Sequence, residues 1–248
     1  MPVYRVEAIV LRRANLGEAD RIVTLYTREH GKVAAVAKGA RKPGSRFVGR
    51  LELFTHLRAL LARGRTLDVV SQVEVVEPFA AIRGDLGRMG AASFIVEVAD
   101  RATPEREPFP VLYRALRDAL LAAAEGDAGL AAAWFAAQVL ALSGYGPVTD
   151  RCVVCQRPIT GGAAFSAALG GALCGPHRER DRGAVPASAV ALATIGFLRE
   201  TGAKALGRVV LDRAQRTEVE ALLRRSVEER FEIRLRSPPV IERITRLR

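Results

Sequence analysis

What is scarce in this sequence excludes several classes of protein. Among its 248 residues only three are cysteine, and aromatic residues make up 6%. No run of about eighteen uncharged apolar residues occurs, so we expect no membrane-spanning helix. The first residues, MPVYRVEAIVLRR, lack the charged, apolar and small-residue segments of a secretory signal. An odd number of thiols without such a signal indicates a reducing compartment, so we expect a cytoplasmic protein without disulfides.

Familiar catalytic motifs are also missing. The chain has no P-loop, no G-x-S-x-G nucleophile elbow and no dinucleotide fingerprint. His30 and His56 are isolated in the sequence and are expected in a turn and a strand. Glu18 and Asp20 lie in a connection without the further carboxylates that a Mg²⁺ site needs. We therefore expect no catalytic residues and a protein that is not an enzyme.

Acidic residues are outnumbered by basic ones. The chain contains 27 aspartates and glutamates against 38 lysines and arginines, which gives a formal net charge of +11 and a pI near 10.5. Such an excess creates a positive field that favours a polyanionic partner. Nucleic acid is the first candidate, and an acidic peptide or an anionic membrane follows. A hydrophobic content of 49% supports a well-buried core.

All three cysteines belong to one pattern. Cys152 and Cys155 form a C-x2-C pair, and after eighteen intervening residues Cys174 and His177 form a C-x2-H pair. Paired knuckles at this separation are typical of tetrahedral zinc. Four protein ligands leave no coordination position for water, so we predict one structural Zn²⁺ in a zinc-ribbon-like module. Glycines and prolines break up the segment, and residues 163–166 with 172–173 are expected to form a hairpin between the knuckles.

Two other interpretations of the metal pattern remain at this point. A zinc-dependent nucleic-acid hydrolase would need an open coordination position and a general base beside it, and the sequence offers neither clearly. A transcription regulator that reads DNA through the ribbon would need basic residues there, whereas the segment from Gln156 to Leu173 contains only Arg157.

The first eighty residues have the pattern of β-strands. Runs rich in β-branched residues are separated by glycine-bearing or polar turns, at residues 3–11, 21–27, 32–38, 57–61 and 67–76. Five short strands suggest a small barrel, for which the five-stranded OB-fold is the natural candidate. An SH3-like barrel fits the pattern as well.

After residue 78 the sequence pattern becomes that of α-helices. Apolar positions recur three and four apart at about residues 79–101, 110–124, 130–143, 187–205 and 217–231, and Ser237-Pro238-Pro239 is expected to end the last helix before a basic tail. Trp134 is expected in the helical core. We predict an α+β multidomain chain: an OB-fold barrel at 1–79, an α-helical domain at 80–147 and 184–248, and a zinc-binding insertion at 148–183.

Basic residues are concentrated in the barrel. Nine lie between Lys32 and Arg65, against the single acidic residue Glu52. We expect a mobile loop at residues 38–46 and contacts with DNA phosphates from seven side chains: Lys38, Arg41, Lys42, Arg46, Arg50, Arg63 and Arg65. Stacking candidates are few, and Tyr26, Phe47 and Phe54 are each equally compatible with the core. Sequence-tolerant binding to the backbone is therefore favoured.

Several motifs of the N-terminal part resemble one known family. The segment 17–31 (GEADRIVTLYTREHG), the segment 36–41 (VAKGAR), Ser45-Arg46-Phe47 and the segment 51–55 (LELFT) are similar to the N-terminal domain of the bacterial recombination mediators of the RecO family. The later layout, a helical domain interrupted by a knuckle pair, is similar too, so the resemblance spans the chain.

The resemblance implies a function. It implies a cytoplasmic, nucleoid-associated protein of the RecFOR pathway that binds single- and double-stranded DNA, anneals complementary strands and helps load RecA onto DNA coated by single-strand-binding protein. It also implies two protein partners, RecR and the acidic C-terminal tail of single-strand-binding protein. For the pocket that receives this tail we expect basic residues of the C-terminal helices, namely Arg213, Arg216, Arg224 and Arg225.

Overall fold

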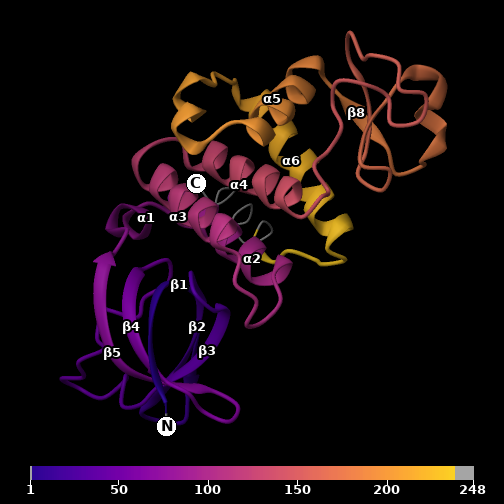
Figure 1. Ribbon diagram of the computed structural model, residues 1–248. Coiled ribbons are helices and arrows are strands. Elements are labelled where there is room, and N and C mark those ends of the chain that lie inside the picture. The colour runs from indigo at the N-terminus through magenta and orange to yellow at the C-terminus, as the bar shows by residue number, and fades with distance from the viewer. Residues whose placement is uncertain (1, 238–248) are drawn as a thin grey trace.

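The computed structural model describes residues 2–237 and shows three parts in a row. A β-barrel lies at one end, a bundle of helices follows, and a small module with its own sheet lies at the other end (Figure 1). The two ends of the molecule are therefore separated by the bundle.

The N-terminal part is a closed five-stranded barrel. Its strands are β1 (Val3–Leu16), β2 (Asp20–Thr27), β3 (Gly31–Ala37), β4 (His56–Ala62) and β5 (Asp68–Glu77). They close in the order β1-β2-β3-β5-β4, and β3 and β5 are parallel while the other neighbours are antiparallel. The predicted OB-like barrel is confirmed. Strand β1 is longer than expected because its first half pairs with β4 and its second half with β2, across an irregularity between Val10 and Arg12.

The connection from β3 to β4 is part of the barrel core. Ala40, Phe47 and Leu51 from this connection are buried with the inward-facing side chains of the strands. Its first turn is hydrogen bonded, since the Arg41 N–H donates to the Ala19 carbonyl over 2.9 Å. The connection is therefore partly buried and hydrogen bonded, and the mobility expected for residues 38–46 stays a prediction. The three stacking candidates are at most 5% exposed, so Tyr26, Phe47 and Phe54 are core residues.

Six α-helices follow among the described residues. They are α1 (Ala80–Gly84), α2 (Leu86–Ala102), α3 (Pro110–Glu125), α4 (Ala128–Leu142), α5 (Ala189–Glu200) and α6 (Arg213–Arg230), with 3-10 turns η1 (Gly175–Arg180) and η2 (Ala203–Arg208). Helix α4, which contains Trp134, is buried along most of its length. Among residues 2–237, no helix combines the length and the apolar character that a membrane span requires.

Two helix boundaries differ from the expectation. The single helix predicted for residues 79–101 is wrong, because Asp85 has extended backbone and caps α2 by accepting the Arg88 N–H over 2.8 Å. Helix α6 begins at Arg213 rather than near residue 217, because Asp212 caps it by accepting the Gln215 N–H, and it ends at Arg230, close to the predicted end at 231. Pro238, Pro239 and the basic tail lie outside the described residues.

The module at the far end is built on a three-stranded sheet. Strands β6 (Ala163–Ser166) and β7 (Gly171–Leu173) form the predicted hairpin, and β8 (Val185–Ala187), which was not predicted, pairs with β6. Phe165, Ala172 and Ala187 are buried in the same hydrophobic cluster as the helical bundle. The module and the bundle therefore share one core.

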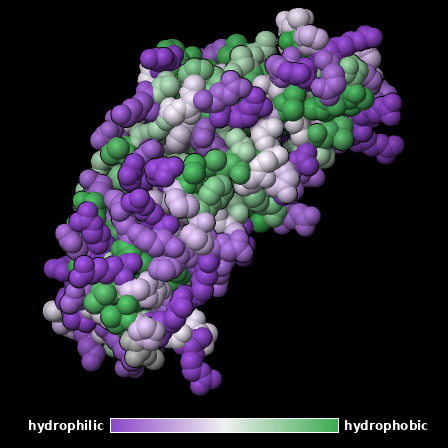
Figure 2. Space-filling view, viewed as in Figure 1, coloured by the Kyte–Doolittle hydropathy of each residue, from purple (hydrophilic) through white to green (hydrophobic). Residues whose placement is uncertain are grey.

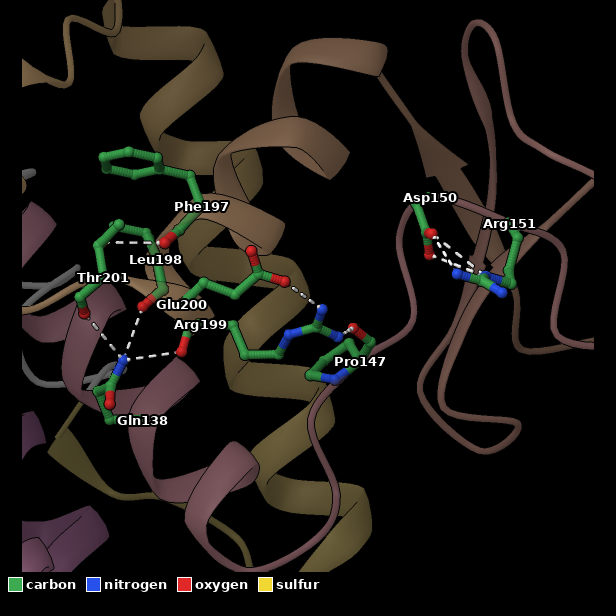
Figure 3. Close-up of polar contacts among 9 residues, drawn as sticks. All are labelled: Gln138, Pro147, Asp150, Arg151, Phe197, Leu198, Arg199, Glu200 and Thr201. Carbon is green, nitrogen blue, oxygen red and sulfur yellow. Dashed lines mark hydrogen bonds and ion pairs between the residues drawn. The ribbon is translucent and has the colours of Figure 1, made fainter.

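Polar contacts fasten the chain where it enters the module (Figure 3). The Arg199 guanidinium of α5 donates to the Pro147 carbonyl over 2.9 Å. Nearby, the Gln138 side-chain amide of α4 donates to the Leu198 carbonyl of α5 over 2.8 Å, which joins the two helices.

Val148 lies so close to Gly171 that a Cβ at this glycine would be 2.2 Å from the Val148 carbonyl oxygen. Only glycine allows this approach of the two segments.

Buried charges fasten the barrel to the bundle. Asp100 of α2 is 7% exposed and forms ion pairs with Arg12 of β1, at 2.8 Å, and Lys32 of β3, at 3.4 Å. Asp68, at the start of β5, is fully buried and accepts hydrogen bonds from the Tyr4 hydroxyl and, over 3.1 Å, from the Arg106 guanidinium. These two carboxylates fix the orientation of the barrel relative to the helices.

Candidate metal centre and nucleic-acid interface

The structure brings the four predicted metal ligands together. The ligand atoms of Cys152, Cys155, Cys174 and His177 all lie within 4.8 Å of one another. The sulfurs of Cys155 and Cys174 are 3.8 Å apart, and Cys152 Sγ is 3.6 Å from His177 Nδ1. Zinc–sulfur bonds of about 2.3 Å in a tetrahedron place two sulfurs about 3.8 Å apart. The donor set therefore fits a tetrahedral metal ion.

Two tight turns present these ligands. In the first, the Gln156 N–H donates to the Cys152 carbonyl and the Cys152 N–H donates to the Arg157 carbonyl, each over 2.9 Å. In the second, η1 begins directly after Cys174, and the His177 N–H donates to the Cys174 carbonyl over 2.9 Å. The β6–β7 hairpin between the turns brings the two ligand pairs to the same place.

Even without a metal ion, the surroundings of Cys152 favour its thiolate form. Burial raises the pKa of Cys152, but N–H groups of Cys174, Cys155 and Val154 point at its sulfur, and the net result is a pKa of about 6. For Cys174, burial and the neighbouring sulfurs raise the pKa. Thiolates so close together repel each other, so a cation among them stabilises the cluster. The three sulfurs and the imidazole would surround such a cation with four donors, so a tetrahedral ion would have no coordination site left for water.

The seven predicted DNA contacts lie in two connections of the barrel. All seven side chains are exposed, and none takes part in an ion pair within residues 2–237. We call this set the barrel cations: Lys38, Arg41, Lys42, Arg46 and Arg50 between β3 and β4, and Arg63 and Arg65 between β4 and β5. The acidic Glu52 is already paired with Arg13 and, at 3.6 Å, with Arg21. The positive charge of the two connections is therefore not neutralised locally.

Several barrel cations are held in place by the barrel itself. Arg41 Nη1 donates to the Gly17 carbonyl over 2.8 Å, and Arg50 Nη1 donates to the Val73 carbonyl over 3.3 Å. Arg46 stacks 5.0 Å from the Phe47 ring centroid, and Arg63 lies 5.8 Å from that of Tyr4. Bonds of this kind orient a guanidinium and leave its remaining N–H groups available for phosphate oxygens.

A second basic feature lies on the helical bundle. A groove of about 660 Å³ runs between α2, α4 and α6, with Ala91, Phe94, Ala132, Ala133, Ala136 and Leu223 in its wall. Arg88, Arg216 and Arg224 also line it, together with Asp85, Asp127 and Glu220. Burial raises the pKa of the Glu220 carboxyl.

Two of the arginines that the sequence suggested for a partner pocket lie at this groove, and no observation tests whether a partner binds there. Of the four arginines expected near a partner pocket, Arg216 and Arg224 line the groove, whereas Arg213 and Arg225 do not. Arg88 was not expected, because it lies on α2, far from α6 in the sequence. No local pattern could have indicated that these two helices share a groove.

Two family models match this chain. A family model described as Recombination protein O N terminal matches residues 1–79, and one described as Recombination protein O C terminal matches residues 83–239. The chain is 38% identical over 237 residues to a DNA repair protein RecO of Desulforudis audaxviator, covering 96% of this chain and 95% of the relative.

Two further relatives are similar. A DNA repair protein RecO of Symbiobacterium thermophilum is 37% identical over 249 residues and 98% of each chain. One of Pelotomaculum thermopropionicum is 49% identical over 175 residues, 71% of this chain and 68% of the relative.

Proposed function

The chain belongs to the RecO family of DNA repair proteins, and from this premise we propose that it is a non-enzymatic mediator of recombinational repair. It binds single- and double-stranded DNA, anneals complementary strands and helps load RecA onto DNA coated by single-strand-binding protein. The observation that carries the proposal is the set of barrel cations: seven exposed basic side chains on an OB-like barrel, none of them paired with an acidic residue within the part of the chain that the structure describes.

Annealing follows from the charge of this surface. Two single strands repel each other through their phosphates, and a protein that neutralises both lets them approach. Lysine and arginine contacts with phosphates leave the base edges free to pair. The scarcity of exposed aromatic residues on the barrel fits a surface that does not hold bases by stacking. Catalysis is not required for any of these steps.

The groove of the bundle suits the acidic tail of single-strand-binding protein. An acidic peptide with an apolar end needs an apolar wall and cations at the rim. Alanines and Phe94 provide the wall, and Arg88, Arg216 and Arg224 are its cations, of which Arg216 is paired with Asp127 at 2.6 Å. We place the tail in this groove and assign RecR to another, unidentified surface of the protein.

The Cys3His site would hold one structural Zn²⁺. Cys152, Cys155, Cys174 and His177 are four ligands of the types and spacing that structural zinc uses. When bound, the ion would replace a large apolar core in the module, whose own buried cluster is small. The hydrolase alternative needs a free coordination position, and the four-donor arrangement offers none.

The test of DNA binding is a charge reversal on the barrel. The double variant Arg41→Glu with Lys42→Glu is expected to bind a homopolymeric single strand about tenfold more weakly at moderate salt. The slope of log K against log salt should become shallower by about 1.4, because each lost phosphate contact contributes about 0.7 on single strands. Fluorescence anisotropy over a salt series measures both quantities, and strand annealing should fall in parallel.

The matched control carries the same charge change on the helical domain. Lys204 and Arg208 are exposed residues of η2, so Lys204→Glu with Arg208→Glu lowers the net charge equally. This control should keep the slope of the unaltered protein. If both double variants lose the same affinity, the effect comes from net charge alone, and the barrel cations are not the DNA-binding surface.

A further inference from the structure

Three arginines follow directly after the second pair of metal ligands. Arg178 and Arg180 belong to η1 and Arg182 lies two residues beyond it, and all three side chains are exposed. None of them forms an ion pair with any residue that the structure describes. We call these three residues the arginine turn. In Figure 2 the module that carries it, at the upper right, shows hydrophilic side chains along its edges around a hydrophobic patch.

The acidic residues of this segment do not neutralise the arginine turn. Asp181, which lies between Arg180 and Arg182, is directed inward: it accepts hydrogen bonds from the Ser166 hydroxyl over 2.5 Å and from the Gly183 N–H over 2.7 Å. Glu179 is the only other acidic residue between Arg178 and Arg182, and it is exposed. Three guanidiniums therefore face solvent against one carboxylate.

Only one of the three arginine charges is needed to offset the net charge of an occupied metal site. A divalent ion with three thiolates has a net charge of −1, and Arg178, the neighbour of His177, is enough to offset it. Arg180 and Arg182 remain in excess. An exposed cation without a partner in its own protein is available to a polyanion from outside.

The arginine turn has a fixed position in the molecule. Phe165 and Ala172 bury the module's sheet in the core of the bundle, and the Arg230 guanidinium of α6 donates to the Ala168 carbonyl over 2.8 Å. The bundle is in turn fastened to the barrel through Asp68 and Asp100. The arginine turn therefore lies at a constant separation from the barrel cations, at the opposite end of the molecule (Figure 1).

We propose that the arginine turn is a second contact surface for nucleic-acid phosphates, so that one molecule binds a strand at each of its two ends. Guanidinium forks match phosphate oxygens and need no pocket. An acidic peptide with an apolar end would need an apolar wall, and the groove that offers one contains no residue of the arginine turn. The proposal rests on the proposed function, since it adds a site to a DNA-binding protein.

The test reverses charge at the two residues farther from the metal ligands. Full-length Arg180→Glu with Arg182→Glu is expected to weaken binding of a homopolymeric single strand severalfold and to make the salt slope shallower by about 1.4, since two contacts are lost. The rate of annealing should fall more than the affinity, because annealing needs two strands on one molecule. The variant Arg180→Lys with Arg182→Lys keeps both charges and should restore the slope.

Each outcome is decisive. If the Glu variant has the salt slope and annealing rate of the Lys204→Glu, Arg208→Glu control, the proposal is wrong, and the Arg41→Glu, Lys42→Glu variant tests the proposed function separately. Unchanged binding of DNA with a lost response to an acidic peptide would assign the arginine turn to a protein partner instead. Metal content, measured on every variant, must stay at that of the unaltered protein; a loss of metal that the Lys variant shares would make the arginines part of the metal site and overturn the proposal.

Discussion

Two lysines near β3 show how position decides the role of a charge. Lys32 is nearly buried, and its ammonium group donates to the Thr103 carbonyl over 2.8 Å and pairs with Asp100. Lys38, six residues later, is exposed and has no ion pair among the described residues. The first lysine stabilises the contact between barrel and bundle, and only the second is exposed enough for the DNA contact that we propose. A count of basic residues in the sequence includes both equally.

The metal ligands give the clearest prediction for a single residue. Cys155→Ser replaces a thiolate by a poor zinc ligand, so zinc affinity should fall by more than the roughly 10–100-fold typical of a lost outer-shell partner. The module should become sensitive to proteolysis while DNA binding by the barrel persists. Metal analysis after dialysis, limited proteolysis and the salt series measure these effects.

The control is Val154→Ser, at an exposed neighbour in the same turn, which should keep one zinc per chain. A cobalt-substituted protein should show the spectrum of a tetrahedral three-sulfur, one-nitrogen site. A spectrum with exchangeable water would instead support an open site and the hydrolase interpretation.

At the scale of elements, helix α6 has one face buried in the bundle, one face at the groove and one face exposed to solvent. Leu222, Leu223 and Val227 are buried, Arg224 lines the groove, and the next residue, Arg225, is exposed outside it. Successive residues on a helix point about a quarter turn apart, so a change of one position moves a charge out of the groove. Helix α6 therefore offers a matched pair of variants.

Arg224→Glu should weaken binding of single-strand-binding protein by about tenfold, because it places a carboxylate where an acidic tail is expected. Arg225→Glu makes the same change in net charge outside the groove and should have little effect. Pull-down or anisotropy with full-length and tail-deleted single-strand-binding protein measures the difference. Equal losses in the two variants, or binding that does not depend on the tail, would contradict the assignment of the groove.

The elements also show what the sequence predicts well. Strands β2 to β5 were expected within two residues of their ends, because β-branched runs alternate with turns that glycine or polar residues mark. The metal ligands followed from their spacing alone. The break at Asp85 was missed although aspartate is a common helix cap, since apolar periodicity continued across it. Pairing between distant segments, such as Lys32 with Asp100 or β8 with β6, leaves no local pattern to detect.

At the scale of the whole molecule, Asp68 links the barrel to the bundle. Burial opposes its ionisation, but hydrogen bonds from Tyr4, the Gly64 N–H and Arg106 keep its pKa below the ordinary value. A carboxyl with a lowered pKa in the folded state stabilises that state above its unfolded pKa of about 4, and the stabilisation is lost as the pH falls. The junction between the two parts should therefore weaken in acid.

Asp68→Asn tests this. At pH 7 the variant should unfold with a free energy about 2 kcal/mol lower, because Arg106 loses a buried partner, and the difference should shrink below about pH 4, where the unfolded carboxyl also binds a proton. Urea unfolding at several pH values measures it. Asp150→Asn removes an exposed pair with Arg151 and should cost at most about 1 kcal/mol. A difference for Asp68→Asn that stays constant with pH would contradict the role of its charge.

The junction also has a consequence for synthesis on the ribosome. Gly31 lies against the Glu107 backbone, so closely that a Cβ would be 2.0 Å from its carbonyl oxygen, and Arg106 N–H donates to the Lys32 carbonyl. The ion-pair partners of Lys32 and Asp68, which are Asp100 and Arg106, thus emerge only after the barrel sequence is complete. A nascent barrel therefore contains two charges whose ion pairs are not yet formed, and both pairs can form once residues 100–107 have left the exit tunnel. We therefore expect the barrel to form first during synthesis and to gain its contacts with the helices afterwards.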